Sequence, residues 1–195
     1  MRILTGFLAA SQGSACISGH DVHADRLAAS RRVGYLPENG PLYGDMTPLQ
    51  SLRFFAEARG LDATTRASRI DEVIAQCGLD GIVEKPIGKL SKGLRQRVGL
   101  AQALVHDPEV LIMDEPTAGL DPNQIQVFRE LVGQLRGRKT ILLSTHILQE
   151  VEAVAERILL IHLGRLVFDG SMADVRQRGS VEALFRGLTQ EGASA

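Results

Sequence analysis

The sequence is poor in cysteine, with only Cys16 and Cys77 among its 195 residues. The two lie far apart along the chain and form no paired-cysteine motif. This excludes the disulfide-rich class of small secreted domains and indicates a reducing compartment. Aromatic residues make up 4% of the sequence, while hydrophobic residues make up 44% and charged residues 23%. That balance is typical of a folded globular protein, and the length favours one domain spanning residues 1–195.

Long apolar runs are also missing. The longest runs, such as Val110–Met113 and Ile158–Ile161, are far short of the roughly 20 residues that cross a bilayer. Any association with a membrane is therefore expected to depend on a partner. The 22 basic and 23 acidic residues leave a net charge of −1, which gives no electrostatic reason to expect nucleic acid as a partner.

The phosphate-binding loop Gly-x-x-x-x-Gly-Lys-Ser/Thr occurs nowhere in the sequence. The nearest imitation is Gly88-Lys89-Leu90, which lacks the hydroxyl residue and has Val83 where the first glycine would be. The sequence thus offers no amide cradle of this type for phosphate.

Strands and helices alternate along most of the chain, which predicts an α/β fold with a parallel or mixed sheet flanked by helices. Consecutive helices within residues 48–105 predict a helical subdomain, and Gly192–Ala195 reads as a loose tail. The expected strands are 14–18, 32–36, 110–113, 140–143, 158–163 and 166–168. The expected helices are 3–8, 47–60, 67–77, 91–106, 122–136 and 147–155.

Two adjacent carboxylates, Asp114 and Glu115, follow the apolar strand Val110–Met113. Open α/β sheets place their ligands at the carboxyl ends of strands. There an aspartate can hold Mg²⁺, and a glutamate can position and deprotonate an attacking water. The alternative is an acidic pair that caps the next turn.

Ser91, Lys92 and Gly93 precede a helical stretch. A serine cap and a glycine at a helix N-terminus present backbone N–H groups and a positive dipole end to an anion. Taken alone, the same residues also describe an ordinary capped helix with a basic face.

Together these segments resemble the ABC ATPase family. Its signature is matched by Leu90–Leu94, its Walker B strand by Met113–Pro116, its D-loop by Ala118–Asp121 and its switch histidine by Ser144–His146. Lys92 and Leu94, in place of the commoner glycine and glutamine, are similar to the branch that drives ABC-2 type exporters.

The resemblance implies a P-loop NTPase-type ABC ATPase sheet with a helical subdomain, and it implies ATP and Mg²⁺ as cofactors. It implies Glu115 and His146 as catalytic residues, Asp114 as the metal ligand, and Ser91, Lys92, Gly93, Glu38 and Asp121 as nucleotide-binding residues. Glu38 stands where the family's Q-loop usually has glutamine. A lone histidine such as His146 is otherwise more often a capping or core residue.

The resemblance also implies partners and a place in the cell. The chain is expected to pair with another ABC ATPase domain, as a homodimer or heterodimer, and to drive export through a separate membrane-spanning subunit from the cytoplasmic face. In the family the phosphate loop precedes a helix that Met1–Leu8 resembles, so the domain is expected to be N-terminally truncated and inactive alone. The alternatives are a non-transport ABC ATPase acting on DNA or ribosomes, and a catalytically dead fragment with a binding role.

Overall fold

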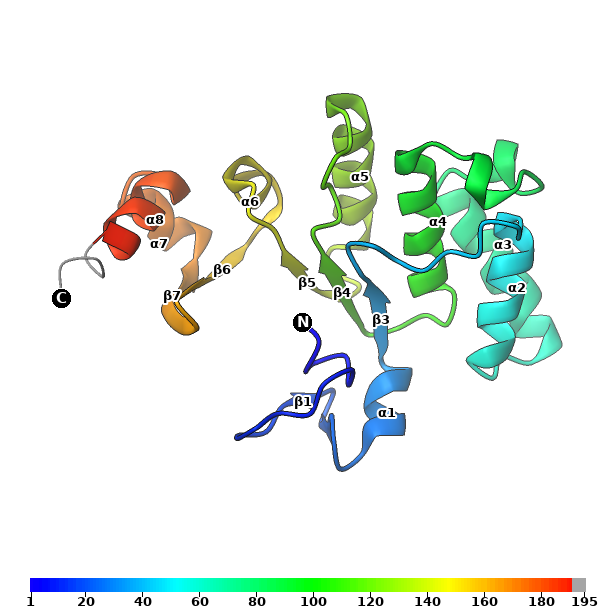
Figure 1. The fold of residues 1–195 in the computed structure, drawn as a ribbon, viewed down its shortest axis with the longest axis horizontal. Helices are drawn as coiled ribbons and strands as arrows, with labels where there is room; N and C mark the ends of the chain where they lie inside the picture. Colours follow the sequence, from blue (N-terminus) through cyan, green and yellow to red (C-terminus); the bar gives the residue numbers. More distant parts are fainter. Residues whose placement is uncertain (191–195) are drawn as a thin grey trace. The chain divides into compact units, whose positions relative to one another are not determined.

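The computed structural model describes residues 1–190 as two compact units, Met1–Ser144 and a second unit that starts at Thr145 (Figure 1). The expected tail at 192–195 lies outside the described residues. Each unit has its own apolar core. The two are described separately below.

The first unit is built on a three-stranded parallel sheet with the order β3-β4-β5. The strands are β3 (Val33–Leu36), β4 (Val110–Asp114) and β5 (Thr140–Ser144). Leu111, Ile112 and Met113 on the central strand are at most 1% exposed, which is why this strand reads as an unbroken apolar run. The prediction of a parallel sheet is confirmed, and the carboxyl ends of all three strands meet at one edge.

Three α-helices lie between β3 and the central strand: α2 (Pro48–Ala58), α3 (Ala63–Gln76) and α4 (Lys92–Leu104). They pack on one another around Leu52, Val73 and Val98, each fully buried. Two single-turn helices, Asp80–Ile82 and Ile87–Lys89, connect α3 to α4. The three helices fall within the expected helical subdomain, whose boundary at 48–105 stays a prediction.

The helix caps explain where these helices begin. Thr47 accepts a hydrogen bond from the amide of Gln50, whose side chain accepts one from the amide of Thr47, so α2 starts at Pro48 as predicted. The expected start of α3 at residue 67 was wrong. Asp62 accepts bonds from the amides of Thr64 and Thr65 and starts the helix one turn earlier.

The amino-terminal part differs from its prediction. Residues 3–8, expected to be helical, form successive turns instead, because Gly6 takes a left-handed φ of +74° that an α-helix cannot contain. A short antiparallel pair follows, β1 (Cys16–Ile17) with β2 (His20–Asp21), and then α1 (Arg26–Arg31) leads into β3. The strand expected at 14–18 is therefore confirmed as a two-residue strand. After β4, α5 (Pro122–Leu135) leads into β5, as predicted.

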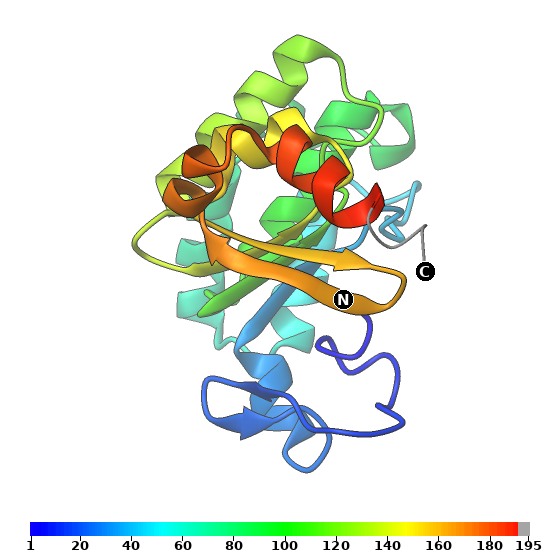
Figure 2. The same cartoon turned by 90° about the vertical axis from the view of Figure 1, so that its left-hand side faces the viewer.

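The second unit is a β-hairpin with helices. It contains α6 (Leu148–Val154), β6 (Arg157–His162), β7 (Arg165–Ser171), α7 (Met172–Gln177) and α8 (Val181–Gln190). Figure 2 shows the hairpin, whose strands pair antiparallel. Helices α7 and α8 were not predicted, although Ser171 and Asp174 form a capping box at the start of α7. Among the described residues, no helix has both the length and the apolar character needed to span a bilayer.

A half-buried histidine, His106, makes the stability of the first unit depend on pH. His106 follows α4, and its Nε2 lies 3.0 Å from the carbonyl oxygen of Val33. Burial, helped by the positive charge of Arg59, lowers the pKa of His106 from 6.5 to about 4. Between these two pH values the unfolded chain binds more protons than the folded one. The contribution of His106 to the free energy of unfolding is therefore complete above pH 6.5 and is lost as the pH falls toward 4.

We therefore expect the free energy of unfolding to drop by about 1 to 2 kcal/mol more in the wild type than in His106→Gln between pH 7 and pH 5. Urea denaturation followed by tyrosine fluorescence measures this. Tyr35 and Tyr43 are the only tyrosines, there is no tryptophan, and both tyrosines belong to the first unit. Replacement of the exposed His23 by glutamine is the control. An equal pH response in wild type and His106→Gln would contradict the assignment.

Candidate functional site

The candidate site lies at the carboxyl edge of the parallel sheet, where Asp114 ends the central strand. Its neighbour in register on β5 is Ser144, whose hydroxyl donates a hydrogen bond to the Asp114 carboxylate. The amide of Glu115 donates to the carbonyl oxygen of Ser144 at 3.0 Å. Ser144 on β5 therefore holds the Asp114 carboxylate in place through its hydroxyl. It also holds the backbone of Glu115 through its carbonyl oxygen.

Glu115 adopts a left-handed backbone with φ of +46°. This region is uncommon for residues other than glycine, and such strained residues concentrate at functional sites. The turn is closed by a bond from the amide of Ala118 to the carbonyl oxygen of Glu115 at 3.1 Å. Glu115 itself is half-buried. The structure thus places a constrained glutamate immediately after the fixed aspartate.

Ser91 caps α4, its hydroxyl accepting from the amide of Leu94 at 3.3 Å. The amides of Lys92 and Gly93 have no acceptor within the described part of the chain. Ser91 and Lys92 are exposed. The N-terminus of this helix therefore presents the exposed hydroxyl of Ser91 and the exposed ammonium group of Lys92, which suit an anion, while Gly93 itself is buried.

Contacts join the start of α4 to the segment that follows Glu115. Gln96 Nε2 donates to the carbonyl oxygen of Pro116 at 2.8 Å. A β-carbon built at Gly93 would lie 2.6 Å from Cδ of Gln124 on α5, and one built at Gly119 would lie 2.4 Å from Nζ of Lys92. The signature residues, the turn after the two carboxylates and the beginning of α5 therefore form one continuous part of the first unit.

Asp121 caps α5. Its carboxylate accepts from the amide of Gln124 at 3.0 Å, and the Gln124 side chain accepts from the amide of Asp121 at 3.4 Å. The same Gln124 packs on Gly93. In the structure Asp121 therefore stabilises the start of α5, close to the signature residues. Its contact with nucleotide stays a prediction.

Two other sequence-predicted residues are placed differently. Glu38 is exposed, in the loop that follows β3, and so lies at the same edge of the sheet as Asp114. His146 belongs to the second unit, where it is exposed between β5 and α6. It is therefore not grouped with the residues of the first unit, and its catalytic assignment stays a prediction.

The oxygens at Asp114 suit magnesium. A carboxylate and a hydroxyl lie together there, and Mg²⁺ is usually bound by one or two carboxylates together with water and substrate phosphates. No group of three or more acidic, histidine or cysteine side chains that could hold a metal occurs among residues 1–190. The pair therefore fits a metal that arrives with a nucleotide. The charge of Asp114 also reaches the next strand, where burial first and this carboxylate second raise the pKa of Tyr35.

Sequence reasoning missed the residues that connect these parts. Gln96 and Gln124 are glutamines on helices, a residue type common on exposed helix surfaces, and nothing in the local pattern marks their contacts. The bond from Ser144 to Asp114 follows from strand register, which a single sequence does not fix.

Known proteins resemble this chain in sequence. The ABC transporter family model matches residues 1–118. The ABC transporter ATP-binding protein NatA of Bacillus subtilis (strain 168) is 35% identical over 187 residues, covering 94% of this chain and 76% of NatA. The Nod factor export ATP-binding protein I of Burkholderia pseudomallei (strain 1710b) is 35% identical over 172 residues, covering 88% of this chain and 57% of that protein.

The fold has a close match among solved structures. A structure described as the ATP-binding subunit of an ABC transporter superposes with a TM-score of 0.84 at 29% identity, covering 96% of this chain and 80% of that one. The family match includes the signature residues and both carboxylates of the candidate site. The chain therefore belongs to the ABC transporter family of ATP-binding proteins, whose members are ATPases.

Proposed function

We propose that the chain is the ATP-binding subunit of an ABC exporter and that it couples ATP binding and hydrolysis to export through a separate membrane subunit. The observation that carries this proposal is the link between the start of α4 and the Asp114-Glu115 turn, made by the bond from Gln96 to Pro116. The direction of transport rests on the relative named for Nod factor export and on Lys92 and Leu94.

The residues divide the chemistry between them. Asp114, oriented by Ser144, would hold Mg²⁺, which when bound with the nucleotide offsets part of the phosphate charge. Glu115 would orient the attacking water and accept its proton. His146 would contact the terminal phosphate, and Glu38 would face the metal or its waters. Ser91, Lys92 and Gly93 would bind phosphate through their amides, hydroxyl and ammonium group.

We further propose that the working form contains two ABC domains, alike or different. ATP would be bound between the signature residues of one domain and the phosphate loop of the other. Ser91 and Lys92 are exposed and thus available to a second domain. Because the 195 residues contain no Gly-x-x-x-x-Gly-Lys-Ser/Thr loop, the signature half of the site is the part that they supply.

The membrane partner would be met on the cytoplasmic face. Phe54 on α2 and Tyr43 before it are 47% and 53% exposed, and their rings form an edge-on pair 6.1 Å apart. Aromatic side chains are enriched at protein interfaces relative to the rest of the surface. We propose this pair as part of the docking surface.

Calorimetric titration with Mg-ATP tests the proposal. The 195-residue chain should bind at least a hundredfold more weakly than a version extended at its amino terminus by the family's phosphate loop, because each charge-assisted hydrogen bond to phosphate is worth about 1.5 to 3 kcal/mol. In the extended version, Asp114→Ala should weaken Mg-ATP binding, whereas Asp45→Ala, a change outside the site, should not. Micromolar binding by the unextended chain would show that the phosphates bind elsewhere.

A further inference from the structure

Lys92 is the first residue of α4, and its charge is unfavourable there. A cation near a helix N-terminus opposes the positive end of the helix dipole. The first turn of α4 contains no acidic residue to offset it. In the part of the chain that the structure describes, Lys139 forms a salt bridge and two hydrogen bonds, whereas the Lys92 ammonium forms neither. The charge of Lys92 is therefore not explained by the stability of α4.

The side chain of Lys92 lies across the turn at Gly119, which leads into α5. A β-carbon built on Gly119 would lie 2.4 Å from Nζ of Lys92, 3.5 Å from Cε and 3.8 Å from Cδ, and these atoms are its three nearest neighbours beyond the adjoining residues. Gly119 has a φ of +69°, a conformation that residues with a β-carbon rarely adopt. The space that a side chain at residue 119 would fill is therefore occupied by the end of Lys92. Figure 1 shows α4 beside α5.

The turn beneath this side chain begins at Glu115 and has an unsatisfied group. It is closed by bonds from the amide of Ala118 to the carbonyl oxygen of Glu115 and from the amide of Leu120 to that of Thr117, both 3.1 Å long. Glu115 and Gly119 have left-handed φ values of +46° and +69°. Thr117 is 3% exposed, and its Oγ1 has no hydrogen-bond partner among the described residues. Such a buried group needs a reason, and a second arrangement of the turn in which the hydroxyl is bonded supplies one.

We propose that Lys92 is a positioning residue that couples the turn at Gly119 to the presence of phosphate. Without phosphate the ammonium lies over Gly119 and keeps the turn in the arrangement described above. When phosphate binds at the start of α4, the ammonium moves to it, and the turn takes the arrangement in which the Thr117 hydroxyl is bonded. Because the turn begins at Glu115, the surroundings of the proposed general base then depend on bound phosphate. This coupling requires the phosphate site proposed above at the start of α4.

Lysine suits such a coupling better than the commoner glycine. Its ammonium is a compact charge on a flexible four-carbon stem, which reaches either of two nearby places. A ligand shifts a conformational equilibrium only when it interacts differently with the two states. Lys92 provides that difference, because its ammonium contacts Gly119 in one state and phosphate in the other. A glycine at residue 92 would have no side chain to make either contact.

Nuclear magnetic resonance of the full 195-residue chain, labelled with ¹⁵N-glycine, tests this coupling. Sodium tripolyphosphate is titrated into the millimolar range at constant ionic strength, so that screening does not change. The amide signal of Gly93 reports phosphate at the start of α4, and that of Gly119 reports the turn. Gly133, where a built β-carbon meets no neighbouring side chain or element within 4 Å, is the internal control. In the wild type Gly93 and Gly119 should shift with the same dissociation constant while Gly133 stays in place.

Lys92→Ala should separate the two signals. Gly119 should no longer respond to tripolyphosphate in this variant. Gly93 should still shift, with a dissociation constant weakened up to about fivefold, because one exposed charge pair is lost. Lys92→Arg keeps the charge and should retain the response of Gly119. Lys89→Ala, which removes an exposed lysine shortly before α4, is the matched control and should behave like the wild type.

Two results would overturn the coupling while leaving the phosphate site in place. One is a wild type in which Gly93 shifts and Gly119 does not, because phosphate would then bind without acting on the turn. The other is an equal shift of Gly119 in the wild type and in Lys92→Ala, because the turn would then respond without Lys92. If neither Gly93 nor Gly119 shifts, the phosphate site proposed at the start of α4 fails, and the coupling fails with it.

Discussion

Replacing Glu115 with glutamine is expected to reduce steady-state ATP hydrolysis about a thousandfold in the version of the chain that carries the family's phosphate loop. Glutamine keeps the size and polarity of the side chain but cannot accept a proton from water. General base catalysis contributes about 10² to 10⁴-fold to rate. The left-handed turn at Glu115 should persist, because it is held by the bonds to Ser144 and Ala118 through backbone atoms.

Phosphate release and Mg-ATP affinity are the two measurements that separate chemistry from binding in this variant. Turnover should fall while the dissociation constant for Mg-ATP and the ATP-dependent dimerisation stay within about threefold of the parent. Glu130→Gln, an exposed change on α5, should leave all three unchanged. Near-normal turnover by Glu115→Gln would remove this residue from the position of general base.

The sheet edge could be predicted because its sequence signals are local. An unbroken apolar run marked the buried strand β4, and the two carboxylates that follow it fall at its carboxyl end. Ser91 and Thr47 were recognisable as caps because helical patterns follow both. Caps, strand ends and apolar runs depend on neighbours in sequence, so one sequence is enough to place them.

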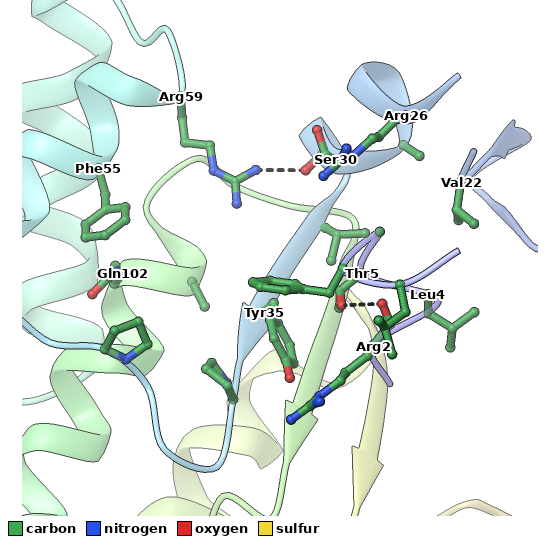
Figure 3. Close-up of a pocket in the computed structure, with 18 of the residues that line it drawn as sticks. Arg2, Leu4, Thr5, Val22, Arg26, Ser30, Tyr35, Phe55, Arg59 and Gln102 are labelled. Atoms are coloured by element: carbon green, nitrogen blue, oxygen red, sulfur yellow. Dashed lines mark hydrogen bonds between the residues drawn. The ribbon is translucent and has the colours of Figure 1, made fainter. Parts of the chain in front are cut away.

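Other features were missed, two because their local signals conflict and one because it depends on residues far apart in the chain. The early start of α3 has a cap at Asp62 but no apolar periodicity in its first turn, Ala63–Arg66, so the pattern pointed to a later residue. The turns at residues 3–8 carry helical spacing, but Gly6 adopts a conformation outside the helix. Residues of α1, α2 and the amino-terminal turns line one groove (Figure 3), and only the tertiary structure brings these elements together.

The second large effect is expected at Gly34, in the strand β3. A β-carbon built there would lie 2.2 Å from the carbonyl oxygen of Ala103 on α4 and 2.9 Å from Cγ of Pro108. Neither neighbour can move aside easily, because one is helix backbone and the other a proline ring. Gly34→Ala would therefore have to push α4 away from β3, opening the core around the fully buried Leu104 and Leu111.

We expect Gly34→Ala to lower the free energy of unfolding of the first unit by about 3 kcal/mol or more, at or beyond the upper end of overpacking effects. The direction of this change is informative, because replacing glycine by alanine in a strand interior otherwise raises the free energy of unfolding by about 0.5 to 1 kcal/mol. Gly133→Ala is the matched control. Gly133 lies in α5, and a β-carbon built there meets no neighbouring side chain or element within 4 Å. The higher helix propensity of alanine should therefore raise the free energy of unfolding of this variant by about 1 kcal/mol.

Urea denaturation followed by the fluorescence of Tyr35 and Tyr43 measures both variants within the first unit. Because β3 leads directly into the loop of Glu38 and α4 begins at the signature residues, a shift between these two elements should also disturb the candidate site. Gly34→Ala should therefore weaken Mg-ATP binding in the loop-extended version, while Gly133→Ala should not. Wild-type stability in Gly34→Ala would mean that β3 and α4 are packed less closely in solution than the structure shows.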